Sequence, residues 1–397
     1  MSWKETCAVD ERAMFVGECL RGDLSVAELC RRYEVSRKTG YKWLGRYEAE
    51  GKAGLKDRSH VPHHCPHGLS EETIEKILEV KKRNPSWGAW KVERWLSARR
   101  PWRHWPAVST IGELFKARGL TTRRKRRPHV PESAPFSGCI GPNDVWTVDF
   151  KGWFRTGDGE RCDPLTLQDA YSRYLLRCQV VRPDREGVWP VFDAAFREFG
   201  LPKAMRSDNG PPFASVAAGG LSKLSVQLIK AGVMPERIRP GKPQENGRHE
   251  RFHLTLKKDA ASPPAASLKA QQRRFDEFRH VYNEERPHQA LQQTPPARHY
   301  APSSARYSGR LREPEYSDDV IVRRVRHNGE IRWKGNTIFV SEVLSGEPVG
   351  CEEGEDGFWH LTYGPISLGW IDNRGRLVRS RRWRSLRWFF RFSNRVL

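Results

Sequence analysis

The sequence lacks the features that direct a chain into or across a membrane. Its N-terminus, MSWKETCAVDERAMF, has no basic start, apolar stretch and small-residue cleavage site of the kind that makes a secretory signal. No run of about eighteen uncharged apolar residues, the length of a transmembrane helix, occurs in the chain. We therefore expect a cytoplasmic protein with no membrane partner.

The eight cysteines form no CxxC pair and no compact framework. This scatter is typical of thiols kept reduced in a cytosol. The segment with His60, His63, His64, Cys65 and His67 resembles a zinc site in composition. It lacks a second ligand pair at zinc-finger spacing and lies among prolines, so we interpret it as a linker.

Acidic residues are few relative to basic ones: 48 Asp and Glu stand against 70 Lys and Arg, a net charge of +22. A polyanionic partner explains this excess well, because neutralising phosphates releases condensed counterions, and nucleic acid is the leading candidate. The alternative is a basic protein with solvated charged faces. With 37% hydrophobic residues and 397 residues in all, the chain can build several domain cores.

Residues 1–60 carry three helical signals in a row, a pattern that predicts a helix-turn-helix domain. Glu11–Leu20 is apolar at helical spacing, Ser25–Tyr33 begins at a capping serine, and Ser36 is placed to cap Arg37–Glu50. On the third helix, Gly40, Leu44 and Tyr47 should pack inward. We expect the opposite side to enter a DNA groove through Arg37, Lys38, Tyr41, Lys42 and Arg46. The alternative is a helical bundle with a solvated face.

Residues 68–122 contain a second helical set, Ser70–Lys82, Gly88–Ala98 and Val108–Arg118, which we interpret as another helix-turn-helix domain. Residues 123–142 follow as a basic, proline-containing linker. Its residues Arg123, Arg124 and Lys125 are predicted to track DNA phosphates, the alternative being a solvated connector.

From residue 143 the periodicity changes to that of an α/β domain, which we place over 143–300. Hairpin strands come first and alternating helices and strands follow, as in a mixed sheet covered by helices. Short strands separated by Asn-Gly and Asp-Gly turns predict a small β-barrel-like domain over 310–385, with a basic aromatic tail over 386–397. The chain is thus expected to be multidomain: helical at its N-terminus, α/β in its core and β at its C-terminus.

Three acids stand where this pattern would aim a carboxylate at a ligand. Asp149 lies inside the apolar strand DVWTVDFKG, where an unpaired carboxylate is costly unless it faces a cation or solvent. Asp208 ends a strand, at the edge where α/β proteins usually bind ligands. Glu250 shares one helix face with Leu254 and Lys257. Carboxylates from separate elements can hold the divalent ions that phosphodiester cleavage uses, and magnesium suits them.

The motifs WTVDFKG, SDNGPPF and PGKPQENGRHERFHLTL, with YNEERPHQAL and TPPARHY downstream, closely resemble the integrase core of bacterial insertion-sequence transposases. These belong to the DDE superfamily, which includes the retroviral integrases. The resemblance implies a ribonuclease H-like fold, with Asp149, Asp208 and Glu250 as ligands of two Mg²⁺ ions that Mn²⁺ can replace. It also implies nicking of element ends, joining of the freed 3′ hydroxyl to target DNA, and a DNA contact by Lys257.

The same resemblance implies as partners the terminal inverted repeats of an element and target DNA. It further implies a homodimer or larger assembly, associated with a bacterial nucleoid. Glu245 is a rival for the third ligand, but the family pattern places that ligand before ArgPhe, which favours Glu250. Asp169 is interpreted as a turn or cap acid.

Two alternatives to a transposase remain. One is a helix-turn-helix regulator with an inactive integrase-like core. The other is a ribonuclease H-like nuclease that cuts without joining. Dependence on magnesium or manganese distinguishes the enzymes from the regulator, and recombinant products distinguish the transposase from the nuclease.

Overall fold

The computed structural model describes residues 7–58, 68–121, 138–239, 247–354 and 357–378. These residues divide into two compact units, with the boundary between Leu69 and Ser70. Several predicted features lie outside the described residues: the histidine-rich segment 60–67, the linker residues Arg123, Arg124 and Lys125, the rival acid Glu245 and the tail 386–397. No helix in the described part of the chain is long and apolar enough to cross a membrane.

The first unit is a three-helix domain, in which the second and third helices begin after the serines predicted to cap them. Its elements are α1 (Ala8–Arg21), α2 (Val26–Arg32), α3 (Arg37–Glu50) and the 3₁₀ turn η1 (Gly51–Leu55). Ser25 Oγ accepts from Glu28 N at 3.3 Å, and the Glu28 carboxylate accepts in return from Ser25 N at 2.9 Å. Ser36 Oγ accepts from Thr39 N at 3.2 Å. These bonds satisfy main-chain N–H groups that a helix start leaves unpaired.

The packing side of α3 is built around Gly40 and Trp43, both of which are buried. The predicted inward positions Leu44 and Tyr47 pack at the edges of this core. Trp43, which the sequence interpretation missed, is its largest side chain. A Cβ on Gly40 would come within 2.5 Å of Cys30 Sγ, so the helices can approach only because this residue is glycine.

The second unit opens with another three-helix arrangement, α4 (Glu71–Arg83), α5 (Ala89–Arg99) and α6 (Val108–Ala117). Its core contains Ile77, Trp87, Val92, Leu96, Ile111 and Phe115. Lys81 Nζ donates to the carbonyl oxygens of Pro85 at 2.7 Å and Trp87 at 2.8 Å. These two bonds hold the turn between α4 and α5.

The central sheet has five strands in the order β5-β4-β1-β6-β7. They are β1 (Val145–Phe150), β4 (Pro164–Asp169), β5 (Leu175–Val180), β6 (Ala204–Ser207) and β7 (Met234–Arg237). The pairs β1–β4 and β4–β5 are antiparallel, whereas β1–β6 and β6–β7 are parallel. This is the strand arrangement of the ribonuclease H-like fold. A short hairpin, β2 (Phe154–Arg155) and β3 (Arg161–Cys162), stands beside it.

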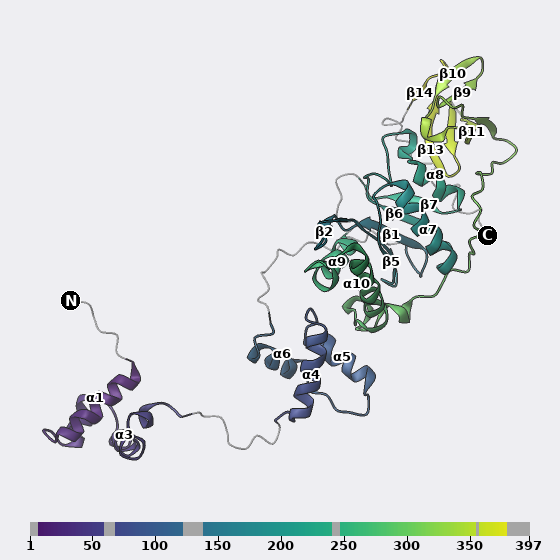
Figure 1. Cartoon of the computed structure of the whole chain (residues 1–397). Helices are drawn as coiled ribbons and strands as arrows, with labels where there is room; N and C mark the ends of the chain where they lie inside the picture. The colour runs from purple at the N-terminus through teal and green to yellow at the C-terminus, as the bar shows by residue number, and fades with distance from the viewer. Residues whose placement is uncertain (1–6, 59–67, 122–137, 240–246, 355–356, 379–397) are drawn as a thin grey trace. The chain divides into compact units, whose positions relative to one another are not determined.

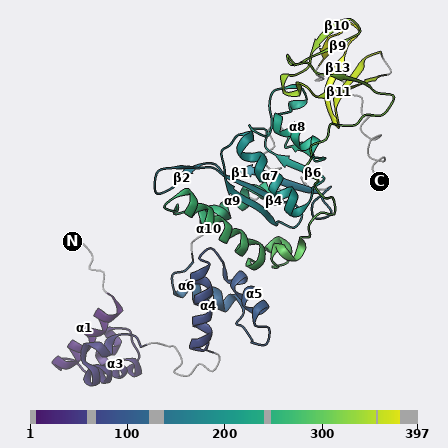
Figure 2. The ribbon, with the colours of Figure 1, turned by 45° about the vertical axis from the view of Figure 1, so that its right-hand side comes forward.

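Helices cover both faces of this sheet, as Figures 1 and 2 show. On one face, α7 (Arg185–Phe199) and α8 (Lys223–Lys230) pack on Trp146 and Val148 of β1. On the other face lie α9 (Gly247–Leu256), η4 (Lys257–Ala261), α10 (Leu268–His280) and η5 (Val281–Glu285). Because strand side chains alternate, the same β1 presents Thr147 and Asp149 to α9.

The C-terminal part is a β domain whose strands are arranged as a five-stranded sheet and a hairpin. The sheet has the order β14-β13-β12-β11-β8, and the hairpin is β10-β9. The strands are β8 (Ile321–Arg324), β9 (Glu330–Trp333), β10 (Asn336–Phe339), β11 (Pro348–Glu353), β12 (Trp359–Tyr363), β13 (Ile366–Ile371) and β14 (Leu377–Val378). Short 3₁₀ turns complete the chain: η2 (Ala218–Gly220), η6 (Gln289–Leu291), η7 (Pro296–His299) and η8 (Glu342–Leu344).

The β domain and the α/β core share apolar side chains. Ala218 and Leu221, which precede α8, and Val226 of α8 itself belong to the same buried cluster as Val349 and Leu361 of the β domain. The domain is therefore anchored to the stretch of chain that follows β6.

Candidate active site

The two predicted aspartates lie at the same edge of the sheet. β1 and β6 run parallel with Thr147 opposite Arg206. Continuing that register by two residues places Asp149 opposite Asp208, where β6 ends. Both strands thus deliver a carboxylate at their C-terminal ends, which agrees with the sequence expectation for Asp208.

Asp208 begins the turn that follows β6. Its Oδ1 accepts from Gly210 N at 3.2 Å, a bond that closes the SDNG turn. The side chain is half-buried. The turn fixes the main chain around Asp208. The second carboxylate oxygen of Asp208, Oδ2, does not take part in this bond.

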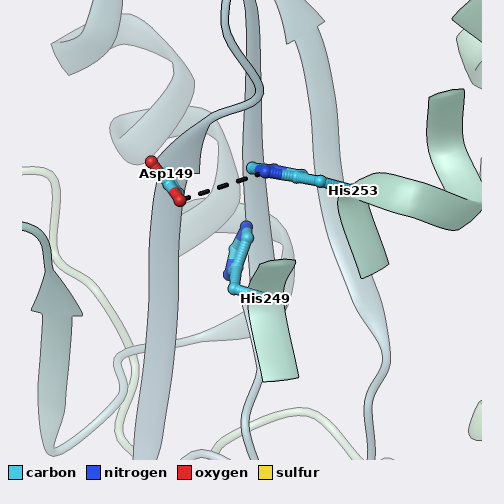
Figure 3. Close-up of side chains that lie close together, drawn as sticks. All are labelled: Asp149, His249 and His253. Carbon is cyan, nitrogen blue, oxygen red and sulfur yellow. Dashed lines mark ion pairs between the residues drawn. The ribbon is translucent and has the colours of Figure 1, made fainter. Parts of the chain in front are cut away.

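Asp149 faces α9 across the neighbouring strand β4, in which Thr166 is its partner. Its side chain is 19% exposed, and its Oδ2 lies 4.0 Å from His253 Nδ1. Figure 3 shows this pair, with the His249 ring beside it. Asp149, His249 and His253 each offer one atom that could bind a metal ion, and these atoms lie within 4.8 Å of one another. This is the candidate metal-binding group found among the described residues.

The two histidines are held by threonine hydroxyls of the sheet. His249 Nδ1 lies 3.0 Å from Thr147 Oγ1, and its Nε2 lies 2.7 Å from Thr166 Oγ1. His253 Nε2 lies 2.9 Å from the same Thr166 oxygen. Burial lowers the pKa of His249 well below its usual value, and His253 adds to this effect. Burial and then Lys151 lower the pKa of His253 to about 3, so both imidazoles are neutral at pH 7.

Glu250 lies on the exposed flank of α9, next to His249 in sequence and one turn before His253. The predicted helix faces are confirmed by burial: Phe252, Leu256 and Ala260 are buried, whereas Glu250, Leu254 and Lys257 are exposed. Asp208 and Glu250 are not part of the compact group around Asp149. The structure therefore gathers Asp149 with the two histidines and does not bring the three predicted acids into one compact group.

The donor types of these residues suit a divalent cation, because carboxylate oxygens are the ligands that Mg²⁺ prefers. Asp149 and Asp208 come from neighbouring strand ends, and Glu250 comes from α9. Lys151 stands near the site, two residues after Asp149. Burial, and then the charge of Lys257, lowers the Lys151 pKa.

Sequence reasoning missed Lys151, His249 and His253. The signals were present, since Lys151 shares the strand face of Asp149 at a spacing of two, and the two histidines recur at the helical spacing of four in NGRHERFH.

Asp169 has the structural role that the sequence predicted. Its Oδ1 accepts from Asn143 N at 2.8 Å and its Oδ2 from Ser172 N at 2.7 Å. Burial raises its pKa despite these bonds. Asp169 thus caps the β4–β5 turn and ties it to the start of β1.

The predicted DNA-contact residues of α3 are largely exposed. Arg37, Lys38, Tyr41 and Lys42 project into solvent. Arg46 is half-buried instead, because its guanidinium carbon lies 4.9 Å from the centre of the Trp43 ring. Part of the Arg46 side chain therefore packs against the core of its own domain.

Comparison with known families agrees with these observations. Residues 141–243 and 231–296 match families described as "Integrase core domain". Residues 11–63 match "Helix-turn-helix domain", and residues 39–115 match "Homeodomain-like domain". The N-terminal part is accordingly of the DNA-binding helix-turn-helix type.

A curated relative decides the family. The chain is 30% identical over 204 residues to the insertion element IS407 uncharacterized 31.7 kDa protein of Burkholderia multivorans, a match that covers 49% of this chain and 71% of that protein. The chain belongs to the insertion-sequence transposases of the DDE integrase superfamily. The transposase chain is also similar to the insertion element IS476 uncharacterized 39.2 kDa protein of Xanthomonas euvesicatoria, at 26% identity over 287 residues, 70% of this chain and 78% of that protein.

Among solved structures, the transposase chain is similar to the simian T-cell lymphotropic virus intasome in complex with PP2A regulatory subunit B56 gamma, at 13% identity and a TM-score of 0.37, covering 77% of this chain and 100% of that one. It is also similar to the HTLV-2 integrase catalytic core domain in complex with magnesium, at 14% identity and a TM-score of 0.30, covering 41% of this chain and 99% of that one.

Proposed function

We propose that this transposase binds the terminal inverted repeats of its element, cleaves the phosphodiester bonds there and joins the freed 3′ hydroxyl ends to target DNA. The observation that carries this proposal is the register of β1 and β6, which brings Asp149 and Asp208 to one sheet edge under the helix that bears Glu250. Metal-assisted phosphoryl transfer uses carboxylates from separate elements, and the neighbouring positions of Asp149 and Asp208 support this assignment.

The residues of the site divide the work between them. Asp149, Asp208 and Glu250 would hold two divalent cations, magnesium or manganese, which supply an activated water and stabilise the leaving oxygen. Lys257, exposed on the same side of the α9–η4 segment as Glu250, would bind a DNA phosphate beside the cut. Lys151, whose pKa is lowered by burial and then by Lys257, would add positive charge at the same place.

DNA recognition falls to the first unit. The exposed residues Arg37, Lys38, Tyr41 and Lys42 of α3 present cations and a ring on one helix face, as a recognition helix does. Because two element ends must be held together for joining, we propose that the working form is a homodimer or larger assembly.

The test is an assay of purified variants on element-end DNA with Mg²⁺. Asp208→Asn should abolish both cleavage and strand transfer while binding of end DNA persists. Glu277→Gln, an exposed acid on α10, serves as the matched control and should retain activity. Strand transfer by the Asp208→Asn protein would overturn the proposal. A chain that binds ends but never cuts them with any divalent ion would instead be a regulator, and one that cuts without forming recombinants would be a nuclease.

A further inference from the structure

A polar pocket lies between α5 and the loop of residues 288–294, far along the chain from α5. Its volume is about 330 Å³, near the lower end of the range of about 300–1,000 Å³ typical of small-molecule sites, so one nucleotide fits it and a double helix does not. The pocket is lined by Trp90, Glu93 and Arg94 of α5 and by Gln289, Gln292 and Gln293 of the loop. The described residues that line it do not include the acids of the candidate active site.

Hydrogen bonds hold the two walls of this pocket in place. Lys91 Nζ of α5 donates to the carbonyl oxygen of Pro287, directly before the loop. The loop itself is closed at its ends, because His288 N donates to the Thr294 carbonyl oxygen at 3.2 Å. Gln293 N also donates to the His288 carbonyl oxygen, at 2.8 Å. The pocket is therefore present before any ligand enters it.

The glutamine wall is costly to build. Gln292 and Gln293 have φ values of +51° and +61°, in the left-handed region that side chains other than glycine rarely adopt. The Gln293 Oε1 atom is buried and has no hydrogen-bond partner within the described part of the chain. Strained backbone and unpaired buried polar atoms both lower stability, and such costs concentrate at binding sites.

The ring of Trp90 is open to a flat partner. Trp90 is 56% exposed. The comparably exposed Trp153 has the Arg161 guanidinium 5.3 Å from its ring centre, whereas no cation of the described residues lies over the Trp90 ring. Arg94 is exposed four residues later on the same helix face. An aromatic ring beside a guanidinium is the combination with which proteins bind a base and its phosphate.

The other polar groups suit the edge of a nucleobase rather than a phosphate. Glu93 places a carboxylate on the wall, with its Oε1 accepting from Ser97 Oγ at 2.7 Å. This carboxylate disfavours a phosphate inside the pocket, but it can accept from the amino group of a base. The glutamine amides both donate and accept, which matches the mixed donors and acceptors of a base edge.

We propose that this pocket binds one unpaired nucleobase of DNA, stacked on Trp90, with its edge bonded by Glu93 and the glutamine amides and its phosphate beside Arg94. The choice of DNA as the polymer rests on the proposed function. It agrees with the position of α5 inside residues 39–115, which match the homeodomain-like family. Extracting a base from a duplex costs free energy, so the preferred target is an overhang or a frayed end.

The experiment measures binding of the full-length chain to a labelled duplex with a short single-stranded overhang, by fluorescence anisotropy. The comparison duplex is identical except that the overhang sugars carry no bases. Because a base gains affinity by stacking on an aromatic side chain, the unaltered chain should bind the overhang with bases about tenfold more tightly. A second probe carries 2-aminopurine in the overhang, and its fluorescence should fall when it stacks on Trp90.

Trp90→Ala should abolish both the preference for bases and the loss of 2-aminopurine fluorescence. Trp102→Ala is the matched control, because Trp102 lies in the turn after α5, is 80% exposed and does not line the pocket. Gln289→Ala changes an exposed side chain of the loop and should reduce the preference severalfold. Circular dichroism checks the folding of each variant. Equal preferences in the Trp90→Ala and Trp102→Ala proteins, or equal binding of both duplexes by the unaltered chain, would overturn the inference.

A free nucleoside monophosphate distinguishes a DNA pocket from a nucleotide site. It lacks the neighbouring phosphates of a strand, so it should compete far more weakly than the overhang does. Competition at the same concentration as the overhang would assign the pocket to a free nucleotide and overturn the inference.

The outcome is separable from that of the proposed function, because the assay requires no cleavage. A chain that prefers the overhang with bases through Trp90 but never joins DNA would keep the inference and lose the transposase mechanism. A chain that joins DNA without this preference would do the reverse.

Discussion

Thr166 Oγ1 lies 2.9 Å from Nε2 of His253 and so connects the middle of the sheet to the helix that carries Glu250. The same oxygen lies 2.7 Å from Nε2 of His249, so one hydroxyl orients both imidazoles. Since Thr166 is the β4 partner of Asp149, the strand that positions the acid is also tied to α9. The geometry between Asp149 and α9 therefore depends on a side chain that has no direct role in chemistry.

Thr166→Val should loosen α9 on the sheet. Valine keeps the shape of threonine but leaves two buried imidazole nitrogens without their partner, so we expect a loss of about 1–3 kcal/mol in the free energy of unfolding. Chemical denaturation measures it. Thr166→Ser, which retains the hydroxyl, is the control and should recover most of the loss; equal stability of the valine and serine proteins would contradict this role.

Trp43→Ala should unfold the first unit. Trp43 is buried at 7% exposure and supports the Arg46 side chain, so its removal should cost about 3–5 kcal/mol. Thermal unfolding followed by tryptophan-independent far-UV circular dichroism reports the effect. Tyr41→Ala changes an aromatic residue of the same helix that is 60% exposed, and it should leave stability nearly unchanged.

Lys38→Ala should weaken DNA binding through charge alone. Lys38 is exposed on the side of α3 that we assign to DNA, so its loss should lower the slope of log affinity against log salt by about one. Fluorescence anisotropy over a salt series measures this slope. Lys52 is equally exposed but lies in η1, and Lys52→Ala should leave the slope unaltered. A comparable fall in both proteins would indicate a diffuse charge effect rather than a recognition face.

His288 should make the second unit sensitive to acid. Burial, with smaller contributions from Lys91 and Arg286, holds the pKa of His288 well below its usual value, so the folded chain keeps this ring neutral. The unfolded chain protonates it near pH 6.5. Below that pH the unfolded state binds the extra proton, and stability falls as pH decreases.

His288→Gln should therefore flatten the decline in stability between about pH 6.5 and 4.5. Urea denaturation at several pH values measures it. The exposed His280→Gln variant is the control, and a decline of the same steepness in the His288→Gln and unaltered proteins would refute the assignment.

Much of the fold was predictable because the deciding signals are local. Ser25 and Ser36 mark helix starts, and the alternation in DVWTVDFKG marks a strand with two different faces. The acids Asp149 and Asp208 could be proposed one by one from such signals. That they lie opposite one another follows only from the pairing of β1 with β6, which joins segments far apart in the chain.

What could not be predicted depends on tertiary contacts. Trp43 was missed because its position on α3 borders the charged side, and only packing against Phe15 and Leu29 shows which side it joins. His249 and His253 were read as part of a motif, but their meaning comes from Thr147 and Thr166 on two other elements. The spacing of four places both histidines on one helix face, but it does not show which residues of the sheet that face meets.

The cluster that joins Ala218, Leu221 and Val226 to the β domain has a genetic consequence. A copy of the gene interrupted shortly after residue 310 would still encode every acid of the candidate site. The shortened protein would nonetheless expose an apolar surface on the segment downstream of Asp208. Such a protein would be prone to aggregation or proteolysis. We therefore expect shortened proteins to be removed by protein quality control before they can act on DNA.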